Sequence, residues 1–251
     1  MSDDSLSARL RRWTPARVSL GRVGSSLPTR PLLQFDLDHA RARDAVYAEM
    51  GCDALAAELR GAAFGEPVAV RSLARDRREY LLRPDLGRTL DAASRRLLAA
   101  SPPCDLAVVI ADGLSALAPE RHAVALLREL HPAGLAGSAT VVLARGARVA
   151  LGDQIGSLLH ASAVVVLIGE RPGLSSPDSL GVYLTWAPQV GRTDAERNCV
   201  SNIRPAGLPY ADAARKIDYL LHEARKFQRS GIALKDDSES SGRRLGESRR
   251  D

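Results

Sequence analysis

The sequence has few of the residues that build disulfide scaffolds, metal centres or membrane spans. It contains three cysteines in 251 residues, with no CxxC spacing, and its five histidines form no HxxxH pair. These counts disfavour a disulfide framework and a structural zinc site, and they fit a reducing compartment. The longest apolar run, residues 161–169, is far shorter than the roughly 20 residues of a membrane span. Residues 1–5 hold no apolar stretch, so we expect neither a secretory signal nor a membrane partner.

Motifs that mark common nucleotide and hydrolase sites are also missing. There is no GxxxxGK[ST] phosphate loop, and no GxGxxG turn follows the strand expected near residue 110. A GxSxG nucleophile elbow is absent as well. A free-standing α/β enzyme that uses a nucleotide is therefore disfavoured, and it remains the alternative to the interpretation developed below.

The net charge of +5 comes mostly from one end of the chain. Residues 1–30 carry six arginines against two aspartates, whereas the tail from Lys235 carries as many acidic as basic residues. Aromatic residues make up 4% of the chain and are not interleaved with arginine as in single-strand-binding proteins. We therefore expect no nucleic-acid partner, although salt-sensitive retention of DNA would indicate one.

With 45% hydrophobic and 26% charged residues, the chain has the composition of a folded globular protein. Residues 1–31 are rich in Arg, Ser, Gly and Pro and predict an extended N-terminal arm without a core of its own. Residues 32–103 form a helical segment and residues 104–234 an α/β domain. Residues 235–251 consist mainly of Ser, Gly and charged residues and predict a disordered tail.

The helical segment opens with apolar residues spread around much of a helix. Leu32, Phe35 and Val46 fall on one stripe, and Leu33 and Leu37 fall on a second stripe beside it. This pattern predicts a helix that reaches about residue 59 and is covered on more than one side. A short strand is expected further along, at residues 68–71.

Apolar runs rich in β-branched residues alternate with helical patterns in the α/β domain. The runs cover residues 105–111, 139–143, 164–169 and 182–186. Continuous runs of this kind are typical of parallel strands that are buried on both faces of a sheet. Right-handed connections then give a doubly wound, mostly parallel α/β sheet of the Rossmann or flavodoxin kind.

Ligands of such open sheets bind at the carboxyl ends of the strands. Polar and small residues follow each run, namely Asp112 and Gly113, Arg148 and Val149, Glu170, and a long loop at residues 192–204 that contains Cys199. Each has an ordinary structural explanation, such as packing for Val149 or a small buried side chain for Cys199. Together they predict one crevice for a large ligand, whose identity these residues leave open.

Long segments of the chain resemble the small subunit of ethanolamine ammonia-lyase, an adenosylcobalamin-dependent enzyme. The resemblance extends from Trp13 to Lys235, and it is densest in residues 14–30, 39–46, 111–115, 169–181, 191–204 and 230–235. A match of this length is more specific than any short motif.

The resemblance implies a hetero-oligomer with a large barrel subunit, six copies of each chain. The large subunit would hold the substrate and the catalytic residues, so we expect none in this chain. The arm of residues 1–31 would dock on the large subunit, and residues 104–234 would cover adenosylcobalamin at the interface. The complex would convert ethanolamine to acetaldehyde and ammonia by radical chemistry. We expect it in the cytoplasm, either free or in a bacterial microcompartment.

Three cobalamin contacts of the family fall on Val149, Glu170 and Cys199. The DxHxxG motif of proteins that replace the nucleotide base of cobalamin with histidine is absent. We therefore expect no side chain of this chain to bind the cobalt, and no metal ligand. Glu170 would accept hydrogen bonds from amides of the cofactor, and Cys199 would touch the cofactor's periphery.

Overall fold

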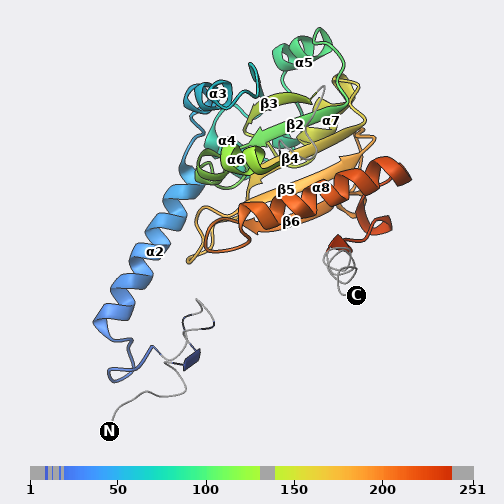
Figure 1. Ribbon diagram of the computed structural model, residues 1–251. Coiled ribbons are helices and arrows are strands. Elements are labelled where there is room, and N and C mark those ends of the chain that lie inside the picture. Colours follow the sequence, from blue (N-terminus) through green and yellow to red (C-terminus); the bar gives the residue numbers. More distant parts are fainter. Residues whose placement is uncertain (1–8, 11–12, 14–16, 18–19, 131–138, 239–251) are drawn as a thin grey trace, which may run out of the picture.

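The computed structural model describes residues 9–10, 13, 17, 20–130 and 139–238. Within this part, one six-stranded sheet has the strand order β1-β3-β2-β4-β5-β6 (Figure 1). Every neighbouring pair from β1 to β4 is parallel, and β5 runs antiparallel to both of its neighbours. The strands are β1 (Val68–Arg71), β2 (Leu106–Ala111), β3 (Ala139–Arg145), β4 (Ala163–Gly169), β5 (Leu180–Trp186) and β6 (Asn198–Ile203).

Helices cover both faces of the sheet, which confirms the predicted mostly parallel α/β architecture. They are α2 (Thr29–Tyr47), α3 (Cys52–Gly61), α4 (Arg77–Leu82), α5 (Ala92–Ala99), α6 (Leu117–Leu130), α7 (Leu151–Leu158) and α8 (Tyr210–Phe227). Helices α3, α6 and α8 pack on one face, and α5 and α7 pack on the other. None of the helices in the described ranges is long and apolar enough to cross a membrane.

The central strand β2 shows why its sequence is apolar throughout. Leu106, Val108 and Ile110 belong to the core under α3, α6 and α8. The alternate residues Ala107 and Val109 belong to the opposite core, under α5 and α7. Because side chains alternate between the faces of a strand, a strand that is buried on both sides needs an apolar residue at every position.

The order of the connections opens a crevice at the carboxyl edge of the sheet. The chain leaves β2 for α6 on one face, and it leaves β3 for α7 on the other. The two departing loops therefore separate between β2 and β3, at the point where ligands of open sheets bind.

Two strand assignments made from the sequence need correction. The fourth predicted run is β5, which is antiparallel, so the loop that directly follows it lies at the opposite edge of the sheet. Residues 198–203 form the edge strand β6 rather than a loop, and Cys199 pairs there with Tyr183 of β5. Of the residues in β6, Val200 and Ile203 are buried, so the strand lacks the apolar pattern that would have revealed it.

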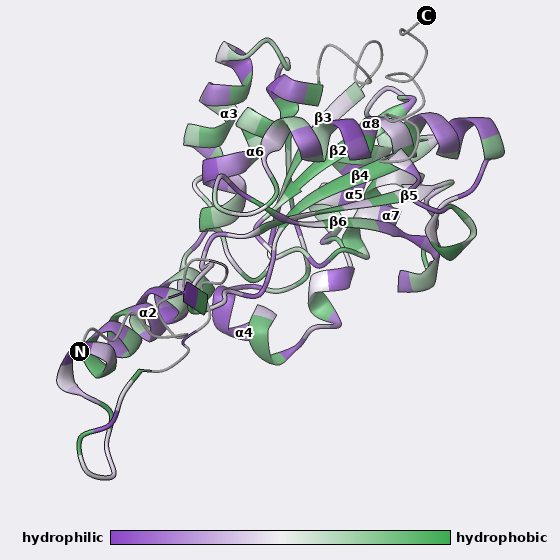
Figure 2. Ribbon diagram, turned by 60° about the horizontal axis from the view of Figure 1, so that its bottom comes forward, coloured by the Kyte–Doolittle hydropathy of each residue, from purple (hydrophilic) through white to green (hydrophobic). Residues whose placement is uncertain are grey.

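The helix predicted up to residue 59 is in fact two helices, α2 and α3. Ala48 has an extended backbone and ends α2, and Met50 then enters the core before α3 begins. Helix α2 projects from the body of the protein (Figures 1 and 2). Of its residues, all within the described part, Ala45 alone is buried. The predicted cover on several sides of this helix is therefore not provided by the described residues of this chain.

The proposed division of the chain into segments remains a prediction. Strand β1 comes from the 32–103 segment and joins the sheet of the α/β domain. Residues 1–8, 11–12, 14–16 and 18–19 of the N-terminal arm and residues 239–251 of the predicted tail lie outside the described residues. Arg17 is described, and its guanidinium forms a 2.6 Å ion pair with Asp38 of α2.

A buried ion pair fixes the start of β6 against α7. The Arg197 guanidinium meets both carboxylate oxygens of Asp153, at 2.6 and 2.7 Å. The two side chains are 1% and 2% exposed, respectively. Arg197 also donates to the Thr185 hydroxyl and to the Arg192 carbonyl. These bonds satisfy most donors of a cation that would otherwise be costly to bury.

We expect Asp153→Ala to lower the free energy of unfolding by about 3–5 kcal/mol, because it leaves the Arg197 cation buried without its counterion. The matched control is Asp194→Ala, which removes a second carboxylate that contacts Arg197 at 3.4 Å but is 97% exposed. It should change stability by less than about 0.5 kcal/mol. Chemical denaturation of both variants measures the difference. Equal losses would show that burial of the pair is not what stabilises this junction.

Candidate functional site

The strand-end crevice has a volume of about 240 Å³ and lies where β2, β3 and β4 end. Its walls come from the last two residues of β4 and the loops that follow these strands, together with one residue of α4 and one of β5. The lining residues are Tyr80, Gly113, Leu114, Arg148, Val149, Ile168, Gly169, Glu170, Arg171 and Tyr183. Three of the four strand-end segments predicted from the sequence therefore contribute to a single cavity.

Two glycines bring the loops after β2 and β4 into backbone contact. A Cβ atom on Gly113 would lie 2.3 Å from the carbonyl oxygen of Gly169, and one on Gly169 would lie 2.0 Å from that of Ser115. The Leu114 N–H donates to the Gly169 carbonyl at 2.9 Å. Gly113 also has a positive φ, which disfavours other residues. These two glycines therefore allow the two backbone segments to pack closely, and they do not form a phosphate-binding loop.

The Asp112 carboxylate joins the ends of β2 and β3. It accepts the backbone N–H groups of Gly146 and Ala147 at 2.9 and 3.0 Å, and it lies 3.6 Å from the Arg77 guanidinium. Arg77 in turn donates to the carbonyls of Gly113 and Val46. Burial raises the pKa of Asp112, while the two N–H donors and Arg77 favour its charged form. This cluster holds α2, α4 and two strand ends together.

Tyr80 forms the wall between the crevice and the Asp112 cluster. Its ring lies between two guanidinium groups, with Arg148 at 4.3 Å and Arg77 at 4.8 Å from the ring centre. Its hydroxyl donates to the Ala147 carbonyl at 3.1 Å. The sequence analysis missed Arg77 and Tyr80 because they lie on the short helix α4, which carries no motif and is distant in sequence from the strand ends.

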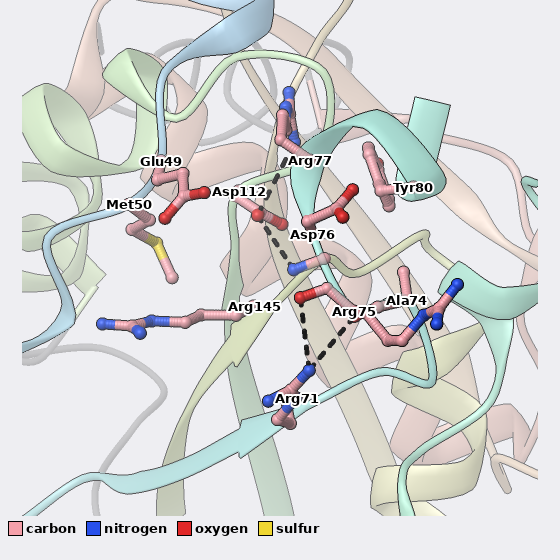
Figure 3. A pocket seen from close by; sticks show the side chains of 11 residues that line it. Glu49, Met50, Arg71, Ala74, Arg75, Asp76, Arg77, Tyr80, Asp112 and Arg145 are labelled. Carbon is pink, nitrogen blue, oxygen red and sulfur yellow. Dashed lines mark hydrogen bonds and ion pairs between the residues drawn. The ribbon is translucent and has the colours of Figure 1, made fainter. Parts of the chain in front are cut away.

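A second pocket lies on the other side of Tyr80 and is shown in Figure 3. It has a volume of about 140 Å³, and arginines and carboxylates both line it. Its Arg75 forms an ion pair with Glu79, Arg77 pairs with Asp112, and Arg71 lies 3.6 Å from Asp91. Because these charges are paired within the chain, we place the candidate site in the strand-end crevice instead.

The three residues predicted to contact a cofactor lie in or beside this crevice. Val149 and Glu170 line it directly. Cys199 is exposed on β6, where it pairs with Tyr183 of β5, a residue that lines the crevice. The negative charge of Glu170 also acts on the Cys199 thiol. Tyr183 was overlooked because it lies within an apolar strand, where its hydroxyl gives no separate signal.

Glu170 is held by contacts from Ser179, the residue before β5, and from β6. Its Oε2 atom accepts a 2.5 Å hydrogen bond from the Ser179 hydroxyl and a 3.2 Å bond from the Asn202 N–H. Its own backbone N–H donates to the Ser179 carbonyl. Among the described residues, no cluster of His, Cys, Asp and Glu side chains is arranged to hold a metal ion.

The fold and the crevice define an α/β chain with a candidate ligand site at its parallel strand ends and a helix that projects from its body. A family model for the ethanolamine ammonia-lyase light chain matches residues 4–235. The chain belongs to this family.

Relatives of the same family match the chain over most of its length. The ethanolamine ammonia-lyase small subunit of Bradyrhizobium diazoefficiens is 58% identical, covering 99% of both chains. That of Rhodopseudomonas palustris is 60% identical over 91% of this chain and 89% of its own. That of Pseudomonas aeruginosa is 52% identical over 92% of this chain and 87% of its own.

The reactivity of Cys199 should report on its neighbours in the crevice. The pKa of its thiol is raised because protein atoms displace water from the sulfur and because Glu170 adds negative charge. Less thiolate is therefore present at neutral pH than in a free cysteine. Cys52 and Cys104 are buried, so alkylation of the folded chain should begin at Cys199.

We expect iodoacetamide to modify Cys199 more slowly at pH 8 than it modifies free cysteine, and the rate to keep rising above pH 9. Glu170→Gln removes the nearby charge, which lowers the thiol pKa and should speed the reaction at pH 8. Mass spectrometry of peptides after timed quenching measures both rates, and Cys199→Ser identifies the labelled peptide. Modification at pH 7 as fast as that of free cysteine would contradict the raised pKa.

Proposed function

We propose that this chain is the small subunit of an adenosylcobalamin-dependent ethanolamine ammonia-lyase, and that its strand-end crevice covers one edge of the cofactor beside a large subunit. The observation that carries the proposal is that Val149, Glu170 and Cys199 gather around one crevice. These positions are far apart in the sequence and come from the connections after β3 and β4 and from the edge strand β6. Their family counterparts are the residues expected to contact cobalamin.

The chemistry of the crevice fits the periphery of a corrin ring. Glu170 offers a hydrogen-bond acceptor, which suits the carboxamide groups around such a ring. Val149 and the Tyr183 ring offer apolar contact beside it. A volume of about 240 Å³ accommodates an edge of the cofactor rather than the whole ring. The remaining contacts would then come from the large subunit, in agreement with a site at an interface.

When bound, adenosylcobalamin supplies a carbon radical that starts the conversion of ethanolamine to acetaldehyde and ammonia. This chain would orient the cofactor through Glu170 and exclude water from one side of it, because reactive intermediates need shelter from solvent. We assign the catalytic residues and the substrate site to the large subunit. Six copies of each chain, and a location in the cytoplasm or a microcompartment, are expectations carried by the family.

Helix α2 is the element that we propose to dock on the large subunit, together with the N-terminal arm. Leu32, Leu33, Phe35 and Leu37 are exposed on this projecting helix. Figure 2 shows apolar and polar residues alternating along it, outside the body of the protein. Exposed apolar residues gathered in this way mark interaction surfaces. A large subunit would provide the cover that the sequence pattern predicts for this helix.

The function is tested by measuring ammonia release from ethanolamine with added adenosylcobalamin. We expect activity when the chain is co-expressed with a large subunit, and none for either chain alone, because the cofactor site needs both. Omission of adenosylcobalamin should abolish turnover. Tight binding of ATP or NAD by the isolated chain, without activity in the complex, would instead favour the free-standing nucleotide enzyme.

Leu33→Asp should weaken assembly with the large subunit at least about tenfold, because it places a charge in the proposed apolar interface. Leu33 is 63% exposed in this chain, so the variant should still fold. The control is Leu97→Asp on α5, another leucine that is 49% exposed but lies on the body of the protein. Co-purification with a tagged large subunit compares the two variants. Equal retention of both would exclude α2 as the docking element.

A further inference from the structure

The two carboxylate oxygens of Glu170 have different surroundings. Oε2 accepts two hydrogen bonds, from the Ser179 hydroxyl at 2.5 Å and from the Asn202 N–H at 3.2 Å. Oε1 accepts none from the residues that the structure describes. Ser179 is 5% exposed, so the first of these bonds is sheltered from water. The protein therefore uses one oxygen as an anchor and leaves the other available.

Gly181 on β5 leaves the space that the available oxygen needs. A Cβ atom at this position would lie 3.0 Å from Oε1 and 3.1 Å from the Cγ atom of Glu170. These distances are shorter than ordinary van der Waals contact, so a side chain at residue 181 would push the carboxylate aside. Glu170 also lines the strand-end crevice.

The chemistry of an ionised carboxylate determines which ligand group can bind at Oε1. An ionised carboxylate accepts hydrogen bonds and donates none, and both of its protein partners here are donors. The group that meets Oε1 must therefore present an N–H or O–H. A primary carboxamide presents two N–H donors and fits this requirement.

We propose that Ser179 is a positioning residue, which holds Glu170 so that Oε1 accepts an N–H from a carboxamide of the cobalamin. This inference rests on the proposed function, because it assumes that cobalamin occupies the crevice. It adds the residue that orients Glu170 and the particular carboxylate oxygen that meets the ligand. The Asn202 N–H assists Ser179, and Gly181 keeps the carboxylate from being displaced.

Glutamine at position 170 tests the direction of the bond. Its single oxygen would turn toward the Ser179 and Asn202 donors, and its NH₂ group would then face the ligand. A cobalamin carboxamide would then have to turn its oxygen toward this NH₂ group and would lose the charge-assisted bond to a carboxylate, so Glu170→Gln should bind cobalamin more weakly than the parent. If the ligand instead donated nothing to Oε1, glutamine would be tolerated.

The experiment measures the affinity of cyanocobalamin for the co-expressed complex of this chain and the large subunit, together with the KM for adenosylcobalamin and kcat. We expect Glu170→Ala, Glu170→Gln and Ser179→Ala each to weaken cyanocobalamin binding about tenfold, as the loss of one charge-assisted hydrogen bond does. Ser179→Thr keeps the hydroxyl and should stay within about threefold of the parent. The changes should raise KM for the cofactor more than they lower kcat.

A double variant separates positioning from a general structural role. Once Glu170 is alanine, Ser179 has nothing to orient, so Ser179→Ala should add no further loss in the Glu170→Ala background. An additive loss would overturn the positioning role. Ser157→Ala, an exposed serine near the end of α7, serves as the control and should leave binding unchanged.

The outcomes distinguish this inference from the function on which it rests. If Glu170→Ala leaves cyanocobalamin affinity unchanged, the proposed cofactor site itself is wrong. If Glu170→Ala weakens binding but Ser179→Ala does not, the site stands and Ser179 does not position it. If Glu170→Gln binds as tightly as the parent, the proposed direction of the hydrogen bond is overturned. This last comparison leaves Ser179 intact, so it is informative even where Ser179→Ala fails to fold.

Discussion

The geometry of the strand-end crevice depends on the buried carboxylate of Asp112. It ties the end of β2 to the turn after β3 through two backbone N–H groups, and Arg77 balances its charge. Each oxygen of this buried carboxylate accepts one backbone N–H of the turn, so the turn has little freedom to move. Arg148 and Val149, which follow that turn, therefore reach the crevice from a fixed direction. Tyr80, packed between Arg77 and Arg148, closes the space behind them.

The same cluster connects the crevice to the projecting helix. Arg77 donates a 2.6 Å hydrogen bond to the Val46 carbonyl in the last turn of α2. The direction in which α2 leaves the body is thus set by a side chain that also contacts Asp112 and Gly113. In the proposed complex, the helix that docks on the large subunit and the crevice that receives the cofactor would share one rigid support. This arrangement suits a chain whose ligand lies at an interface.

Much of the sheet was predictable because strands that are buried on both faces have continuous apolar sequences. Runs such as residues 106–111 are apolar at every position, as strands buried on both faces require. The edge strand β6 was not predicted, because several of its residues are exposed and half of them are polar. The break between α2 and α3 was missed for a related reason. Apolar residues continue across it, and Met50 turns inward where a helical pattern would also place an apolar side chain.

The α/β class, the family, and the strand-end positions of Val149 and Glu170 could be predicted from the amino-acid sequence. These follow from local patterns and from long matching segments, which need no knowledge of distant contacts. Tertiary structure alone decided that Tyr80, Arg77 and Ser179 support the same crevice, and that β6 brings Cys199 beside it. Such contacts join residues up to about a hundred positions apart, and chain order does not encode which loops meet. These contacts form because buried polar groups need hydrogen-bond partners, and the folded sheet brings partners from distant parts of the chain next to them.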